Sequence, residues 1–173
     1  MSKVDLASLV RNIPDFPLPG IQFKDITTLI GNGPAFSQVI DLLAERYSAV
    51  SVDAVVGVES RGFIFSAPLA LRLGVGLVPV RKPGKLPAET FQIEYELEYG
   101  SNRLEIHRDA FAPGARVVVV DDLLATGGTI SAASQLIERA GASVIEFAFV
   151  IELAFLGGRE RLAPHPVYSL IQY

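Results

Sequence analysis

The run VVVVDDLLATGGT at residues 117–129 constrains the fold more than any other part of the chain. Four consecutive β-branched residues predict a buried strand, and the glycine pair predicts a tight turn into a helix over residues 129–140. Further apolar runs occur at residues 53–58, 75–80 and 144–151, and helical patterns occur at 34–47 and 62–73. This alternation predicts an α/β fold with a mostly parallel twisted sheet flanked by helices.

The length, net charge and composition of the chain exclude several classes of protein. The 173 residues suffice for one domain, and we expect a single domain over residues 1–173. The net charge of −4 argues against a nucleic-acid partner. The absence of cysteine excludes disulfides and thiolate catalysis, and with only His107 and His165, to which we assign no role, a histidine-rich metal site is not expected.

The N-terminal residues carry no secretory signal, because Asp5 interrupts the apolar run. A short helix over residues 3–11 is expected to end before Pro14. No stretch approaches the roughly 20 apolar residues that cross a bilayer. We therefore expect a cytoplasmic protein with no membrane partner.

Residues 125–129 have the features of a phosphate-binding loop. In an open parallel sheet, ligands bind beyond the carboxyl ends of the strands, where these residues lie. Gly127 and Gly128 let backbone N–H groups converge on a ligand, the helix N-terminus favours an anion, and the hydroxyls of Thr126 and Thr129 add donors.

Asp121 and Asp122 directly follow the predicted strand and precede this loop. Carboxylates only accept hydrogen bonds, so they suit the vicinal hydroxyls of a ligand whose phosphate occupies the loop. Such a ligand is a ribose 5-phosphate. The alternative is that the two aspartates merely close a strand and Thr126 merely caps a helix; the length of the whole run favours binding. The nucleotide motifs GxxxxGKS/T and GxGxxG are absent.

Two other turns follow predicted strands. One carries Glu59, Ser60 and Arg61, and the other carries Lys82 and Lys85. Each is a weak signal alone, but both fall where the phosphate loop lies, so we expect them to bind a second anionic group, such as a diphosphate.

Residues 91–99 alternate strictly between apolar and polar side chains, which predicts an antiparallel strand with one wet face. A turn at 100–102 and renewed alternation at Leu104 and Ile106 predict a hairpin. A long hairpin inserted in an α/β core is typical of a functional element. Residues 84–106 are therefore a candidate lid.

The run at 117–129 resembles the phosphoribosyl diphosphate signature of the type I phosphoribosyltransferases. Flanking motifs narrow the resemblance to the adenine phosphoribosyltransferases and cover nearly the whole chain. These motifs are PDFP at 14–17, PGIQFKDI at 19–26, ESRGF at 59–63, RKPGKLP at 81–87, LEYG at 97–100 and GRERLAP at 158–164.

The resemblance implies a purine salvage transferase, a homodimer that converts adenine and 5-phosphoribosyl 1-diphosphate to AMP and diphosphate. It implies Mg²⁺ as cofactor, held mainly by substrate and water rather than by protein ligands. By motif position, the 5-phosphate would meet Ala125, Thr126, Gly127, Gly128 and Thr129, and the ribose hydroxyls Asp121 and Asp122. The diphosphate would meet Glu59, Ser60, Arg61, Lys82 and Lys85. A cis peptide bond before Ser60 is expected.

The resemblance also assigns the base and the chemistry. Gln22, Phe23 and Lys24, in an N-terminal hood over residues 1–33, would bind the base, with Phe23 stacking on it. Glu98, Tyr99 and Arg61 would be catalytic, and Glu98 would accept the proton that the base loses. Spacing alone favours a solvated glutamate at position 98. Two other functions stay open: transfer to another base, and a regulator without catalysis that senses a nucleotide.

Overall fold

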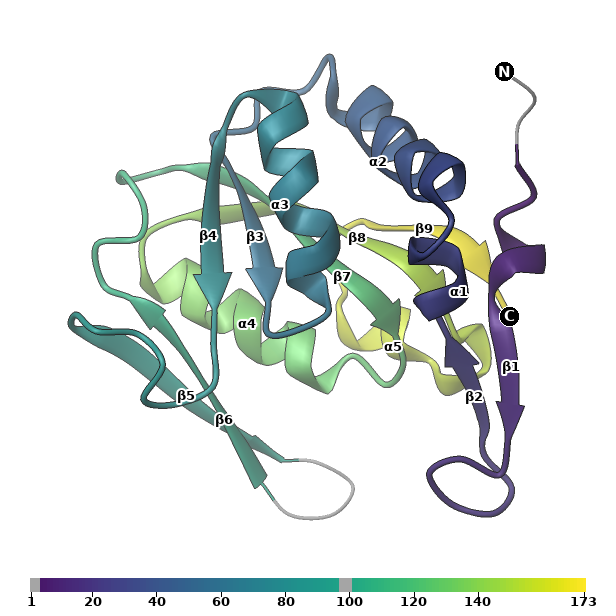
Figure 1. Cartoon of the computed structure of the whole chain (residues 1–173). Helices are drawn as coiled ribbons and strands as arrows, with labels where there is room; N and C mark the ends of the chain where they lie inside the picture. Colours follow the sequence, from purple (N-terminus) through teal and green to yellow (C-terminus); the bar gives the residue numbers. More distant parts are fainter. Residues whose placement is uncertain (1–3, 97–100) are drawn as a thin grey trace.

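The computed structural model describes residues 4–96 and 101–173, and its centre is a parallel sheet (Figure 1). Glu98 and Tyr99 lie outside the described residues. The strand order is β4-β3-β7-β8-β9, and every neighbouring pair is parallel. The strands are β3 (Ala54–Val58), β4 (Gly76–Val80), β7 (Arg116–Leu124), β8 (Ser143–Glu152) and β9 (Val167–Gln172). The predicted α/β fold is confirmed.

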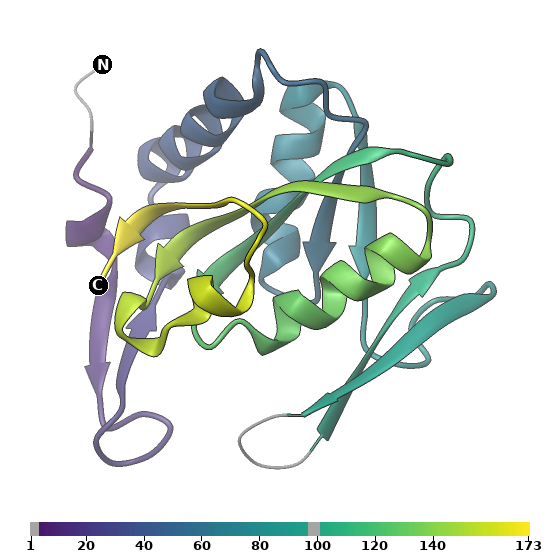
Figure 2. The same cartoon turned by 180° about the vertical axis from the view of Figure 1, so that it is seen from behind.

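Helices cover both faces of the sheet (Figures 1 and 2). On one face, α2 (Gly33–Tyr47) and α3 (Gly62–Leu73) pack on Val118 and Val120; on the other, α4 (Gly128–Arg139) packs on Val117 and Val119. Because β7 is buried on both sides, all four valines are apolar rather than alternating with polar residues. The remaining helical segments are short: η1 (Ala7–Leu9), α1 (Thr27–Ile30), η2 (Ala154–Leu156) and α5 (Gly158–Arg161).

Two antiparallel hairpins flank the sheet. The first joins β1 (Arg11–Pro14) to β2 (Gln22–Asp25), and the second joins β5 (Thr90–Glu96) to β6 (Ser101–His107). In β5, Phe91, Ile93 and Tyr95 pack against the core on the α4 side of the sheet, while the residues between them are exposed. The alternation predicted for this segment is confirmed over its described part.

The structure corrects two local expectations. The helix expected over residues 3–11 is limited to Ala7–Leu9, because residues 11–14 pair with β2 instead. The strand expected at 117–120 continues to Leu124, so Asp121 and Asp122 lie within β7, where β8 supports them. Within residues 4–96 and 101–173, no helix is long and apolar enough to cross a membrane.

Candidate active site

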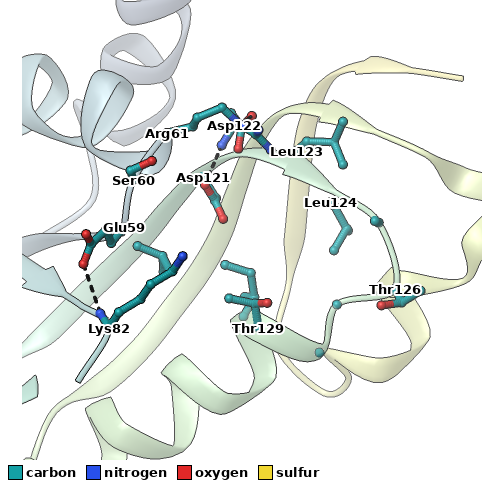
Figure 3. Close-up of a pocket in the computed structure, with 15 residues that line it drawn as sticks. Glu59, Ser60, Arg61, Lys82, Asp121, Asp122, Leu123, Leu124, Thr126 and Thr129 are labelled. Atoms are coloured by element: carbon teal, nitrogen blue, oxygen red, sulfur yellow. Dashed lines mark hydrogen bonds and ion pairs between the residues drawn. The ribbon is translucent and has the colours of Figure 1, made fainter. Parts of the chain in front are cut away.

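A cavity of about 370 Å³ opens at the carboxyl ends of β3 and β7 (Figure 3). Its wall includes every residue predicted to bind the sugar phosphate or the diphosphate, except Lys85. The lining residues are Val58, Glu59, Ser60, Arg61, Lys82, and the continuous segment 121–130. Parallel topology explains this convergence, since it gathers the carboxyl ends of all the strands at one edge.

The loop at residues 125–129 leads into the N-terminus of α4. Gly127 has a φ of 79°, a left-handed conformation that suits glycine. No described side chain caps this N-terminus, and its first turn holds no acidic residue. The first N–H groups of a helix lack partners within it and attract anions. The hydroxyl of Thr129 donates to Oη of Tyr95 at 3.3 Å, which ties the loop to the β5–β6 hairpin.

The first residue of α5 lies directly against this loop. A Cβ atom added to Gly158 would lie 2.1 Å from the carbonyl oxygen of Ala125, and one added to Gly127 would lie 2.9 Å from the carbonyl oxygen of Gly158. Only two glycines allow the two backbones to come this close. The sequence motif contains Gly158, but nothing local in the sequence indicated this contact.

Asp121 and Asp122 have different surroundings. Oδ1 of Asp121 accepts a hydrogen bond from the N–H of Asp122 at 2.9 Å, while Oδ2 of Asp122 lies 2.5 Å from Nε of Arg61 (Figure 3). Burial, and next the charge of Asp122, raise the pKa of Asp121 well above its ordinary value. A Cβ on Gly62 would lie 2.9 Å from Oδ1 of Asp121, so glycine there lets α3 begin beside the carboxylate.

Glu59 anchors the loop after β4. Its carboxylate accepts from the N–H of Lys82 at 3.0 Å and from Nε of Arg81 at 3.2 Å (Figure 3 shows the first bond). The bond from the Lys82 N–H and the neighbouring Arg81 lower the pKa of Glu59. The peptide bond between Glu59 and Ser60 is cis, as the resemblance implied.

A second carboxylate, Glu105 of β6, holds the same loop from the other side. Its Oε1 accepts from the N–H groups of Lys85 and Leu86, both at 3.0 Å, and its side chain is buried. Lys85 therefore has its backbone fixed, although its side chain does not line the cavity. No sequence pattern pointed to Glu105, because its partners lie about 20 residues away.

The residues predicted to bind the base lie in β2 and do not line the cavity. The Gln22 side chain accepts from Asn12 at 2.6 Å, and the ring of Phe23 packs edge-on against Phe16 with centroids 5.1 Å apart. Nζ of Lys24 lies 3.9 Å from the ring centroid of Tyr173. Their role in binding the base stays a prediction.

The fold and the site define the class of protein. An open parallel sheet carries the uncapped loop and the adjacent aspartates at its carboxyl edge, and the family model described as the phosphoribosyl transferase domain matches residues 27–169. The chain belongs to this family.

Similar proteins narrow the assignment to the adenine phosphoribosyltransferases. The enzyme of that name from Chloroflexus aurantiacus is 78% identical over 173 residues, which cover 100% of both chains. The crystal structure of the adenine phosphoribosyltransferase from Thermoanaerobacter pseudethanolicus superposes with a TM-score of 0.94 at 53% identity, covering 98% of each chain. The Saccharomyces cerevisiae enzyme, in complex with an imino-altritol bisphosphate and adenine, has a TM-score of 0.90 at 46% identity over 96% of each chain.

Proposed function

We propose that this chain transfers the phosphoribosyl group of 5-phosphoribosyl 1-diphosphate to adenine, forming AMP and diphosphate in purine salvage. One observation carries the proposal. A single cavity combines an uncapped, glycine-containing helix N-terminus with two adjacent aspartates and with the cations Arg61 and Lys82. A ligand with a phosphate, a diol and a second anionic group matches these features. The reaction type, transfer of a phosphoribosyl group, is inferred from the family to which the chain belongs.

In this proposal, the N–H groups and hydroxyls of residues 125–129 bind the 5-phosphate, and Asp121 and Asp122 accept hydrogen bonds from the ribose hydroxyls. Both aspartates lie on β7, which is paired with β3 and β8. Strand positions hold side chains more rigidly than loops do. The ribose would therefore be oriented by the sheet and the phosphate by the helix.

The diphosphate would lie between the loop at 59–61 and the loop at 81–85, near Arg61 and Lys82. Glu59 would act by holding Lys82 rather than by touching the diphosphate, since its carboxylate already accepts three hydrogen bonds, two from Arg81 and one from Lys82. Lys85 would reach this group only by side-chain movement. Arg61 would stabilise the charge that develops on the departing diphosphate.

Magnesium fits this cavity as an ion that arrives with the substrate. Among the described residues, the cavity wall carries three carboxylates and two cationic side chains, so these side chains do not by themselves neutralise a diphosphate. No group of three His, Asp or Glu side chains among the described residues is placed to hold a metal ion. When bound, Mg²⁺ would neutralise phosphate charge through substrate oxygens and water. Arg61 and Lys82 would supply the remaining positive charge.

The base would bind beside the N-terminal hood, residues 1–33. We propose that Phe23 stacks on the base and that Gln22 and Lys24, its neighbours in β2, also bind it. Glu98, in the lid at residues 84–106, would accept the proton of adenine, and Tyr99 would lie beside it. The yeast relative, which was crystallised with adenine, supports a base site in this fold.

A homodimer in the cytoplasm completes the proposal. The exposed side chains of Leu71 on α3 and Leu77 on the edge strand β4 offer apolar surface that a second copy would bury. Light scattering after size-exclusion chromatography measures the oligomeric state directly.

The reaction is tested by supplying adenine, hypoxanthine, guanine and xanthine separately, with 5-phosphoribosyl 1-diphosphate and Mg²⁺. AMP from adenine alone supports the proposal. Turnover of another base would leave the proposed sugar site standing and would show that adenine is not the base that accepts the phosphoribosyl group. Binding of the sugar without turnover of any base would point to a regulator. The double variant Asp121→Ala, Asp122→Ala should bind the sugar much more weakly; unchanged turnover would reject the roles given to these aspartates.

A further inference from the structure

Glu152, the last residue of β8, is a buried carboxylate with hydrogen bonds to both of its oxygens. Its side chain is 4% exposed. Arg159 of α5 donates to it twice, from Nε at 3.0 Å and from Nη2 at 2.5 Å. The hydroxyl of Ser169 and the amide of Gln172, both on β9, donate at 2.5 and 3.1 Å. These donors, Arg159 foremost, lower the pKa of Glu152, so the carboxylate is ionised.

This carboxylate adjoins the phosphate loop along two routes. In the sheet, Glu152 pairs with Leu124, the last residue of β7 before the loop, and the N–H of Leu153 donates to the Leu124 carbonyl at 2.9 Å. Through its side chain, it binds Arg159, which directly follows Gly158 in the chain. The backbone of Gly158 lies against Ala125 and Gly127 of the loop.

α5 needs an external anchor. It has only four residues, too few for a helix to be stable by itself. Two parallel N–H···O bonds from a guanidinium fix both the distance and the direction of the group that carries it. Since α5 is the wall against which residues 125–127 pack, its placement determines how closely the loop's N–H groups can converge.

We propose that Glu152 is a positioning residue for the phosphate loop, acting through Arg159 to hold Gly158 against Ala125. It does not touch the substrate. This inference rests on the proposed function of residues 125–129 as the site of the 5-phosphate.

The same strand provides a matched control. Glu146, six residues earlier in β8, has a side chain that is 9% exposed. It receives two bonds of 2.6 Å from Arg46 and one of 2.7 Å from Tyr47. Its partners belong to α2, and it does not line the cavity. Glu146 therefore resembles Glu152 in burial and in its arginine, but it accepts its hydrogen bonds from α2 rather than from α5, and only the charge of Arg159 reaches it.

The test compares Glu152→Gln with Glu146→Gln in the full-length protein. Glutamine keeps the volume but turns one acceptor into a donor that faces the arginine. Calorimetry would measure the affinities for ribose 5-phosphate, which needs the loop, and for inorganic diphosphate with Mg²⁺, which does not. We expect Glu152→Gln to weaken ribose 5-phosphate binding by at least about tenfold, because a small displacement of binding groups has large effects. Diphosphate binding should be unchanged, and Glu146→Gln should alter neither.

Any other result would overturn either the positioning role of Glu152 or the proposed 5-phosphate site. Unchanged ribose 5-phosphate affinity in Glu152→Gln would overturn the positioning role. Equal weakening of both ligands, or equal weakening in both variants, would also overturn it, because general destabilisation would explain either result. If the unaltered protein fails to bind ribose 5-phosphate, the proposed 5-phosphate site itself is wrong. If Glu152→Gln does not fold, the same affinities are measured for Arg159→Lys, with Arg46→Lys as its control. Lysine keeps the charge of arginine but cannot form the bidentate pair with the carboxylate.

Discussion

Nε of Arg61 lies 2.5 Å from Oδ2 of Asp122, and this ion pair joins the start of α3 to the end of β7 at one side of the cavity. The pair is asymmetric: the Arg61 side chain is 54% exposed, whereas that of Asp122 is 8% exposed. Arg61 belongs to the proposed diphosphate subsite, and Asp122 belongs to the proposed ribose subsite. Stability and binding should therefore respond differently to the loss of each.

We expect Arg61→Gln to destabilise the fold more than Asp122→Asn does. The first leaves a buried carboxylate without its cation, at a cost of about 1–3 kcal/mol. The second leaves an exposed arginine that water solvates, at a cost of about 1 kcal/mol or less. Urea unfolding measures both, and the double variant should resemble Asp122→Asn. Equal losses from the two single variants would contradict this reading of the pair.

Asp121→Asn should make the protein more stable at neutral pH while weakening ribose 5-phosphate binding. Burial and the neighbouring charge raise the pKa of Asp121 well above 3.8. A raised pKa for an acid means that folding disfavours its ionised form. The resulting penalty is absent below about pH 4 and grows as the pH rises to the raised value.

This prediction is tested by measuring the free energy of unfolding of the parent and of Asp121→Asn from pH 3 to pH 8. The two curves should meet at the acidic end and separate towards neutrality, with the variant higher. A variant that is less stable at pH 7 would show that ionised Asp121 is stabilised by its surroundings. Such a trade of stability for binding is common at functional sites.

Gly158→Ala should harm both the fold and the binding of ribose 5-phosphate. The new Cβ would lie 2.1 Å from the Ala125 carbonyl oxygen, and both backbones would have to separate. Overpacking of this kind costs about 1–3 kcal/mol. Gly76→Ala is the control, because its Cβ would meet no atom of the described residues within 4 Å and its φ is not positive. Thermal unfolding and calorimetry should detect a change only in the first variant.

Glu105→Ala should loosen the loop that carries Lys82 and Lys85. Removal of the carboxylate leaves the N–H groups of Lys85 and Leu86 without their acceptor, and we expect a loss of about 1–3 kcal/mol. Affinity for diphosphate should fall with it. Glu94→Ala on the same hairpin is the control, since Glu94 is exposed and water replaces its pair with Arg103 at little cost. Equal effects of the two changes would argue against a specific role for Glu105.

Most of the sheet and its helices could be predicted from local patterns. Helical periodicity, capping and the glycine at position 74, where φ is 69°, are properties of neighbouring residues. The same holds for the four valines of β7. Parallel topology then brought the turn at 59–61 and the loop at 125–129 into one cavity, as the alternation of strands and helices had implied. The resemblance to a known family added the predictions that the base is adenine and that the reaction is phosphoribosyl transfer.

The hairpin of β1 and β2 could not be predicted in the same way. Residues 11–14 form a strand because Gln22–Asp25 pair with them, whereas the local pattern indicated only a helix over residues 3–11. The extension of β7 through Asp121 and Asp122 likewise depends on its pairing with β8. A strand is stabilised by partners that are distant in sequence, so its ends are set by the sheet.

The sequence by itself indicated the α/β class, through the alternation of strand and helix patterns along the chain. It also indicated the proposed phosphate loop and the adjacent aspartates, because these are encoded in one short, continuous run. The tertiary structure alone decided which glutamates are structural anchors. Glu105, Glu146 and Glu152 look like other acidic residues in the sequence, yet each is buried against specific donors. Burial and hydrogen-bond partners arise when distant segments pack together, so no local pattern contains them.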